Sequence, residues 1–286
     1  MRIIRTIGQM KNEHKPVCLA AGFFDGVHTG HQEVLRRAVC CAQAHGGHAW
    51  VMTFDTHPLK VLRPDAAPPL LTSTPHKLAL IDRLGLHGCL LIPFTRRLAG
   101  MAPEAFLNTL HAGMPTLREI FVGTDWRFGH RGAGDTALLE QWAARHDLQV
   151  TKVPPVRWRG QPVSSTRIRQ AIAAGKLADA AVMLGRPFSL LGTVQPGRRV
   201  GRQLGYPTAN LAAHNEVRPP LGVYAVRAIR RNRTYAGILN FGVHPTLDAA
   251  PAPLFELLPD CVDCVCDALR CVVLRDVFEL LCESIP

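Results

Sequence analysis

The sequence contains no apolar run long enough to cross a lipid bilayer. The longest apolar stretch near its start, residues 17–24, leads directly to Asp25, whereas a membrane-spanning helix needs about 20 apolar residues. The order of basic, apolar and small residues that is typical of a secretory signal is also missing. These absences exclude a membrane-spanning helix in this region, and we expect a cytoplasmic protein.

The cysteines are not arranged as a disulfide framework. They number nine, an odd count, and no secretory signal accompanies them, so we expect reduced thiols. Four of them, Cys261, Cys264, Cys266 and Cys271, gather near the end of the chain without the paired Cys-x-x-Cys knuckles of zinc sites. A divergent tail with incidental thiols is the favoured interpretation, and a zinc site is the alternative.

Acidic residues are scarce relative to basic ones. The chain has 22 Asp and Glu against 33 Lys and Arg, which gives a formal net charge of +11. Such a charge suits nucleic acid, a membrane surface or small polyphosphates. Arginine is scattered rather than gathered in one run, which disfavours the first two partners. We therefore expect small, phosphate-bearing substrates, no nucleic-acid or membrane partner, and a monomer or weak oligomer.

From Val17 to about Leu184, short β-rich runs alternate with helical patterns, which predicts a mostly parallel sheet covered by helices on both faces. The predicted strands are Val17–Ala21, Ala49–Phe54, Gly88–Pro93, Glu119–Val122 and Gln149–Val153. The predicted helices are His31–His45, Pro75–Leu84, Pro103–His111, Asp135–Arg145, Ser165–Ala173 and Leu177–Met183. Ligands of such sheets bind at the carboxyl ends of the strands.

After Gly185, β-type segments separated by Gly and Pro replace the helical periodicity, which predicts a small antiparallel barrel. The predicted strands are Leu190–Val194, Gly222–Ile229, Thr234–Phe241, Pro253–Leu258 and Ala268–Leu274, with a hairpin turn over Arg230–Arg233. With 286 residues, the chain is long enough for two domains that each bury a core.

Two histidines, His28 and His31, mark the start of the first predicted helix, directly after the first predicted strand. Free backbone N–H groups and the helix dipole favour anions at such a position. Gly26 and Gly30 let a phosphate approach the backbone. The pattern favours stabilisation of the charge on a nucleotide's phosphates during attack at the α-phosphorus. A structural pair or a metal site is the alternative.

A second helix start contains Ser164, Ser165, Thr166 and Arg167. The hydroxyls suit N-capping, and the guanidinium suits a triphosphate. The alternative is an ordinary capped helix with solvated arginines.

A third segment, residues 201–210, offers a glycine loop followed by Thr208 and Asn210. Residues two apart in an extended strand point to the same face, so these two side chains can share one Mg²⁺. An ordinary turn is the alternative.

Three segments, residues 28–31, 123–129 and 164–169, resemble the signatures of the bacterial bifunctional riboflavin kinase/FMN adenylyltransferase family, and the resemblance covers about Pro16 to Glu256. It implies an α/β chain with a Rossmann-like nucleotidyltransferase domain over residues 1–184 and a riboflavin-kinase-like barrel over residues 185–286. ATP would be a co-substrate, and riboflavin, FMN and FAD would be substrates and products.

The resemblance also implies the residues of the adenylyltransferase site, with His28, His31 and Arg167 as the catalytic ones. Asp55 stands where the family is expected to have glutamate. The implied binding residues for ATP and flavin are Gly22, Phe24, Asp25, Gly30, Asp55, Gly123, Asp125, Phe128, Ser164, Ser165 and Thr166. Ordinary strand-end packing is the alternative role for Asp125, Trp126 and Phe128.

In the barrel, the resemblance implies Mg²⁺ on Thr208 and Asn210 and a general base at Glu256. The implied kinase loop contains Gly201, Arg202, Gly205 and Pro207. After Glu256 the family's glycine-containing hairpin is missing, Pro259 denies the sheet a backbone donor, and no full-length final helix follows. Two alternatives therefore stay open: an FMN adenylyltransferase with an impaired kinase half, and a non-catalytic basic protein that binds nucleic acid.

Overall fold

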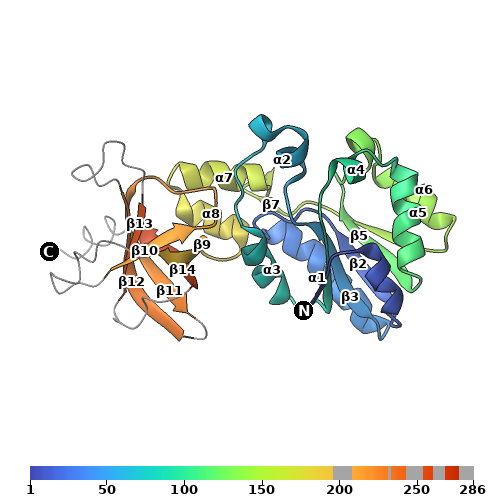
Figure 1. Cartoon of the computed structure of the whole chain (residues 1–286), viewed down its shortest axis with the longest axis horizontal. Coiled ribbons are helices and arrows are strands. Elements are labelled where there is room, and N and C mark those ends of the chain that lie inside the picture. The colour runs from blue at the N-terminus through green and yellow to red at the C-terminus, as the bar shows by residue number, and fades with distance from the viewer. Residues whose placement is uncertain (196–207, 231–232, 243–253, 260–267, 277–286) are drawn as a thin grey trace. The chain divides into compact units, whose positions relative to one another are not determined.

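The structure is a computed structural model that describes residues 1–195, 208–230, 233–242, 254–259 and 268–276. The chain divides into two compact units. The first contains Met1–Pro68 and Thr74–Val163, and the second contains Pro69–Ser73 and Ser164–Pro286. Figure 1 colours the elements along the chain. The boundary of the functional domains at residue 185 stays a prediction.

The first unit is built on a six-stranded sheet in which every neighbouring pair is parallel, in the order β1-β4-β3-β2-β5-β6. The strands are β1 (Arg2–Ile4), β2 (Val17–Ala21), β3 (His48–Phe54), β4 (Gly88–Ile92), β5 (Leu117–Gly123) and β6 (Gln149–Val153). The predicted parallel sheet is confirmed. Strand β1 was missed because three residues carry no readable periodicity.

Helices cover both faces of this sheet. They are α1 (Thr29–Ala44), α2 (Pro58–Leu62), α3 (Thr74–Asp82), α4 (Arg96–Ala99), α5 (Pro103–Gly113) and α6 (Thr136–Ala144). Side chains alternate along β2, so Val17 and Leu19 join the buried cluster of α5 and α6, whereas Cys18 and Ala20 join that of α1 and α3. Two apolar layers therefore hold the sheet between the helices.

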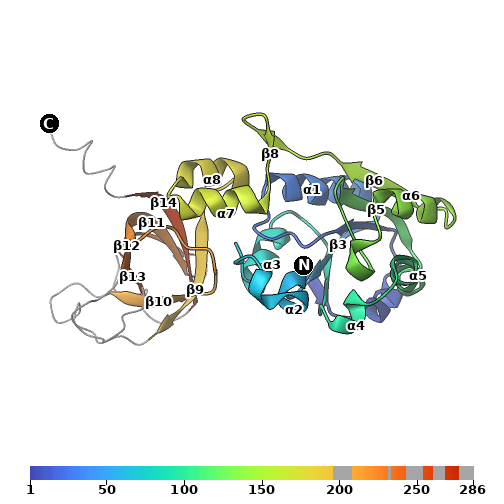
Figure 2. The same cartoon turned by 90° about the horizontal axis from the view of Figure 1, so that it is seen from above.

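The second unit is a closed barrel preceded by two helices, α7 (Ser165–Ala173) and α8 (Leu177–Leu184), which lie side by side in both views (Figures 1 and 2). The barrel strands are β9 (Ser189–Gln195), β10 (Ala209–Ala213), β11 (Gly222–Arg230), β12 (Arg233–Gly242), β13 (Leu254–Pro259) and β14 (Ala268–Asp276). Each pairs antiparallel with its neighbours in the order β10-β13-β12-β11-β14-β9, which confirms the predicted barrel.

The predicted hairpin over Arg230–Arg233 agrees with the pairing of these two residues across β11 and β12, and residues 231–232 lie outside the description. Pro259 is the last residue of β13, where it pairs with Gly237. Proline at a strand end interrupts the ladder less than proline inside a strand. The strand β14 follows and completes the barrel between β11 and β9.

A short segment of the chain, Pro69–Ser73, belongs to the second unit although residues on both sides of it belong to the first. Asn215, which is 1% exposed, donates through Nδ2 to the carbonyl oxygens of Leu71 at 2.5 Å and Ser189 at 3.1 Å. Its Oδ1 accepts from the Leu191 N–H at 3.0 Å. One buried amide thus joins this segment to the first strand of the barrel.

One sequence-based expectation is wrong. The structure pairs Cys18 with Cys41 as a disulfide, so not all thiols of the chain are reduced. The two residues lie on β2 and α1, which pack against each other, and their Cα atoms are 6.4 Å apart. That separation is within the range of protein disulfides. An odd count of cysteines says nothing about which pairs the fold brings together.

Among the helices of the described residues, none combines the length and apolarity that crossing a membrane requires.

Candidate functional site

The loop between β2 and α1 has an unusual backbone. Phe24, Gly26 and Val27 have φ angles of 57°, 80° and 42°. Positive φ is rare for a bulky or β-branched residue and costs roughly 1–3 kcal/mol per residue. Phe24 and Val27 are both buried in the core. Their burial holds the loop in this conformation, which opens the first turn of α1 at the carboxyl end of β2.

His28 is the N-cap residue of α1 and is buried. Its Nδ1 accepts a hydrogen bond from the backbone N–H of His31 at 3.3 Å, so the neutral ring carries its proton on Nε2. The two imidazole rings stack, with centroids 3.5 Å apart. A Cβ at Gly30 would lie 3.2 Å from the His28 ring. The predicted pair is therefore brought together at a helix N-terminus, the position that favours anions.

The metal alternative for this pair finds no support in the described part of the chain. The group of metal-ligating side chains found there contains Cys18, Cys41 and His45, and includes neither His28 nor His31. One ring nitrogen of His28 is used in the helix cap, and the phosphate-binding role of the pair stays a prediction.

Lys77, which the sequence did not single out, ties the same loop to the end of β3. This side chain on α3 is 2% exposed. Its Nζ donates to the carbonyl oxygens of Phe23 and Phe54, at 3.1 and 2.8 Å, and to Thr53 Oγ1 at 3.1 Å. Three acceptors use the three donors of an ammonium group. The buried lysine thus fixes the entrance of the loop that carries the histidine pair.

Burial lowers the pKa of Lys77 from 10.5 to about 8, although the charges of Asp25, Cys89 and Asp55 act in the opposite direction. The unfolded chain keeps this proton up to its ordinary pKa. Between about pH 8 and 10.5 the unfolded state therefore holds a proton that the native state has released. The free energy of unfolding contributed by this group consequently rises with pH in that window.

We expect urea denaturation to show this slope for the wild-type chain and not for Lys77→Met. The exposed Lys11→Met variant is the matched control and should behave like the wild type. Identical pH profiles of the wild type and Lys77→Met would contradict the lowered pKa.

Asp55 connects the ends of two neighbouring strands. Its Oδ1 accepts from the Phe94 N–H at 3.2 Å, and its carbonyl oxygen accepts from Thr74 Oγ1 at 2.6 Å. The residue therefore shapes the strand ends of β3 and β4, next to the loop held by Lys77.

The predicted segment after β5 contains both exposed and buried residues. Gly123 ends β5, and Asp125 is exposed. Phe128 is buried and stacks on Trp126, with centroids 4.5 Å apart. This placement makes Phe128 part of the core, and a contact with the nucleotide or flavin stays a prediction for all three predicted residues.

The second predicted helix start is an N-terminus as expected. Ser164 is the N-cap of α7, and its Oγ accepts from the Arg167 N–H at 3.3 Å. Ser165 and Thr166 begin the first turn. These residues belong to the second unit, so a phosphate site that they share with His28 stays a prediction.

In the barrel, three strands bring polar side chains into one row. Asn210 on β10 lies opposite Glu256 on β13, and Glu256 lies opposite Asn240 on β12. Thr208 Oγ1 donates to Glu256 Oε1 at 2.6 Å. Neighbouring positions such as Leu211 are buried, so the row lies on the other face of the strands. Thr208, Asn210 and Glu256 therefore converge, and Asn240 joins them.

Comparisons with known proteins agree with this two-part arrangement. Residues 10–167 match the FAD synthetase family, and residues 184–257 match the riboflavin kinase family. The bifunctional riboflavin kinase/FMN adenylyltransferase of Escherichia coli K12 is 33% identical over 249 residues, covering 86% of this chain and 80% of that protein. The chain belongs to the bifunctional riboflavin kinase/FMN adenylyltransferase family. The resemblance noted in the sequence is confirmed.

Two further relatives extend the comparison of this family member. The protein of the same name from Bacillus subtilis is 34% identical over 243 residues, covering 83% of this chain and 75% of that protein. A crystal structure described as a macrolide-efflux protein from Streptococcus pneumoniae has a TM-score of 0.79 at 28% identity, and the match covers 99% of this chain and 96% of that one.

Some of the predicted kinase residues of this family member lie outside the described residues. They are Gly201, Arg202, Gly205 and Pro207. Three of the tail cysteines, Cys261, Cys264 and Cys266, lie outside as well.

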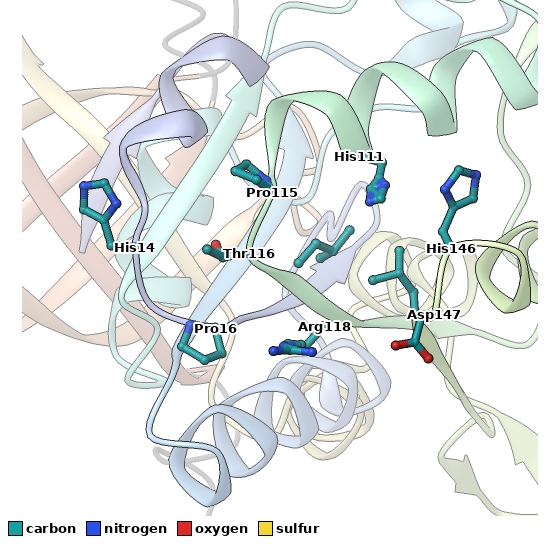
Figure 3. Close-up of a pocket in the computed structure, with 10 residues that line it drawn as sticks. His14, Pro16, His111, Pro115, Thr116, Arg118, His146 and Asp147 are labelled. Atoms are coloured by element: carbon teal, nitrogen blue, oxygen red, sulfur yellow. The ribbon is translucent and has the colours of Figure 1, made fainter.

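A pocket of about 330 Å³ lies at the other ends of the parallel strands (Figure 3). It is lined by residues that precede or begin β2 and β5, among them Pro16 and Arg118, and by His14, His111 and His146. Burial and the neighbouring His146 lower the pKa of His111, which favours a neutral ring. None of the predicted site residues lines this pocket. Because ligands of parallel sheets bind at the carboxyl ends of the strands, the His28 loop stays the predicted place of the nucleotide.

Proposed function

We propose that this chain makes flavin coenzymes in two ATP-dependent steps. The barrel phosphorylates riboflavin to FMN, and the N-terminal domain adenylylates FMN to FAD with release of pyrophosphate. The observation that carries the proposal is the match of a FAD synthetase family and a riboflavin kinase family, in this order, along one chain. The substrates are small molecules, and the enzyme works in the cytoplasm.

In the adenylylation step, an oxygen of the FMN phosphate attacks the α-phosphorus of ATP, and the bond from that phosphorus to the pyrophosphate oxygen breaks. The attacking phosphate is already ionised, so the protein needs no nucleophile of its own. The backbone N–H groups at the start of α1 and the Nε2–H of His28 stabilise the charge on the phosphate oxygens. The resemblance to the family implies a role for Arg167, at the start of α7, in binding the ATP phosphates, and a guanidinium suits such an anion.

In the phosphorylation step, Glu256 takes the proton from the ribityl hydroxyl while this oxygen attacks the γ-phosphorus of ATP. The Thr208 hydroxyl donates to one carboxylate oxygen of Glu256 and so orients this side chain. The oxygens of Thr208 and Asn210 are of the hard type that Mg²⁺ prefers, so these residues fit the ion. When bound there, Mg²⁺ neutralises charge on the ATP phosphates.

Separate assays with each flavin test the proposal. With Mg-ATP, purified protein is expected to convert riboflavin to FMN and FMN to FAD, measured by chromatography with fluorescence detection. If the protein forms FAD from FMN but forms no FMN from riboflavin, it is an adenylyltransferase with an impaired kinase half, and the two-step proposal is wrong. Tight, salt-sensitive RNA binding with neither conversion would favour a non-catalytic nucleic-acid-binding protein.

A further inference from the structure

Two cysteines face each other between the sheet and the first helix of the N-terminal unit. Cys18 lies on the central strand β2 and is fully buried, and Cys41 lies on α1 and is half-buried. The structure joins them as a disulfide. Neither residue takes part in the flavin chemistry proposed above.

Polar ligand atoms surround this pair. His45 Nδ1 lies 3.8 Å from Cys41 Sγ, and it lies with the two sulfur atoms in a group whose members are all within 4.8 Å of one another. Cys41 and His45 are four residues apart at the end of α1, so they share one face of the helix. Cys41 Sγ also lies 3.2 Å from Glu119 Oε2, and the other carboxylate oxygen of Glu119 accepts from Thr151 Oγ1 at 2.5 Å.

The contact with Glu119 has a chemical requirement. A sulfur in a disulfide has no proton to donate, so Cys41 Sγ can hydrogen-bond to the carboxylate only as a thiol. The surroundings of Cys41 therefore suit the reduced form as well as the oxidised one. In the reduced form, two sulfur ligands and one imidazole lie within 4.8 Å of one another, and the Glu119 carboxylate contacts one of the sulfur atoms, Cys41 Sγ.

These are the ligand types of tetrahedral zinc sites. With zinc–sulfur bonds of about 2.3 Å and zinc–nitrogen bonds of about 2.0 Å, a tetrahedral site separates sulfur from nitrogen by about 3.5 Å. The observed separation between Cys41 Sγ and His45 Nδ1 is 3.8 Å. His45 Nδ1 also lies 2.9 Å from the Cys41 carbonyl oxygen, and zinc binding would exchange that contact for a bond to the metal.

We propose that the dithiol form of the chain binds Zn²⁺ through Cys18, Cys41 and His45, with Glu119 or water in the fourth position, and that the disulfide closes this site. Reduction by a dithiol breaks the sulfur–sulfur bond, places one proton on each cysteine and converts the reductant to a cyclic disulfide. Zn²⁺ then displaces the two thiol protons, so binding releases acid.

Cobalt substitution tests the site. Full-length protein is reduced with dithiothreitol, freed of reductant under argon and titrated with Co²⁺. We expect the intense thiolate-to-cobalt and d–d absorption bands of a tetrahedral site. Zn²⁺ should displace the bound Co²⁺ in a one-to-one ratio and remove these bands. Cys41→Ser should lose these bands, and His45→Ala should weaken binding at least about tenfold, since even outer-shell partners of a metal are worth that much. The adjacent exposed thiol gives the matched control, so Cys40→Ser should bind as the wild type does.

The outcomes separate this site from the cysteines of the tail. Equal cobalt bands in the wild type and Cys41→Ser, or no bands in the reduced wild type, would overturn the proposal. Oxidation with diamide should abolish binding in the wild type. Zn²⁺ should also raise the melting temperature of the reduced wild type and leave that of Cys41→Ser unchanged. The melting transition of Cys41→Ser shows in the same experiment that the variant is folded.

Discussion

His28→Ala is expected to lower the rate of FAD formation from FMN by about 10²–10³-fold, the typical effect of losing one donor that stabilises developing charge. The imidazole lies at the N-terminus of α1, stacked on His31, and in the proposed step its Nε2–H donates to a phosphate oxygen. Riboflavin phosphorylation should stay within about twofold, because Glu256 and its partners lie in the barrel. Steady-state kinetics with each flavin measure both effects in one preparation.

A second variant separates the chemistry of His28 from its role as a helix cap. Asparagine caps helices well, whereas alanine at an N-cap costs about 1 kcal/mol. His28→Asn should therefore keep the thermal stability of the wild type and still lose FAD formation. His146→Ala, an exposed histidine of the pocket at the other strand ends, should change neither activity. An equal loss of both activities in His28→Ala would refute the division of labour between the two domains.

Glu256→Gln is expected to lower riboflavin phosphorylation by about 10²–10⁴-fold, the range that a positioned general base contributes. Glutamine keeps the size of the side chain and an oxygen that accepts from Thr208, so the pairing of β13 with β10 and β12 should persist. Only the ability to take a proton is lost. The rate of FMN formation under saturating Mg-ATP measures the effect.

The same Glu256→Gln preparation contains its own control. Adenylylation of added FMN should proceed at the wild-type rate, because the histidine loop belongs to the other unit. A fall in phosphorylation of less than about fivefold would remove Glu256 as the base. A similar fall in both activities would indicate a folding defect instead.

Most of the fold follows from periodicity. The strands at Val17–Ala21 and Gln149–Val153 and the helix at Ser165–Ala173 have the predicted bounds. Elements of three to five residues were missed, among them β1 and the short helices α2 and α4. Such segments owe their structure to what they pack against, which a local pattern does not contain. Strand β10 (Ala209–Ala213) was not among the predicted strands, although Thr208 and Asn210 were expected in an extended conformation.

The parts of the site that are formed by residues close together in the sequence were predictable. The N-cap at Ser164 follows from hydroxyls before an apolar helical run, and His28 was predicted to lie at a helix start, although its capping role was not. Lys77 was missed because the residues that supply its three acceptors lie between 23 and 54 positions away from it along the chain. The pairing of Cys18 with Cys41 depends on how α1 packs on β2. Asn240 joins Glu256 only through the register of two barrel strands.

The path of the chain restricts how the two activities can be separated. Asn215 depends for one of its buried hydrogen bonds on Leu71, a residue that precedes most of the adenylyltransferase sequence. A fragment that starts anywhere after residue 73 would leave that amide hydrogen without its acceptor, at a cost of about 1–3 kcal/mol. Gene fission between the two halves would therefore give a weakened kinase, which is a structural reason for keeping both halves in one polypeptide.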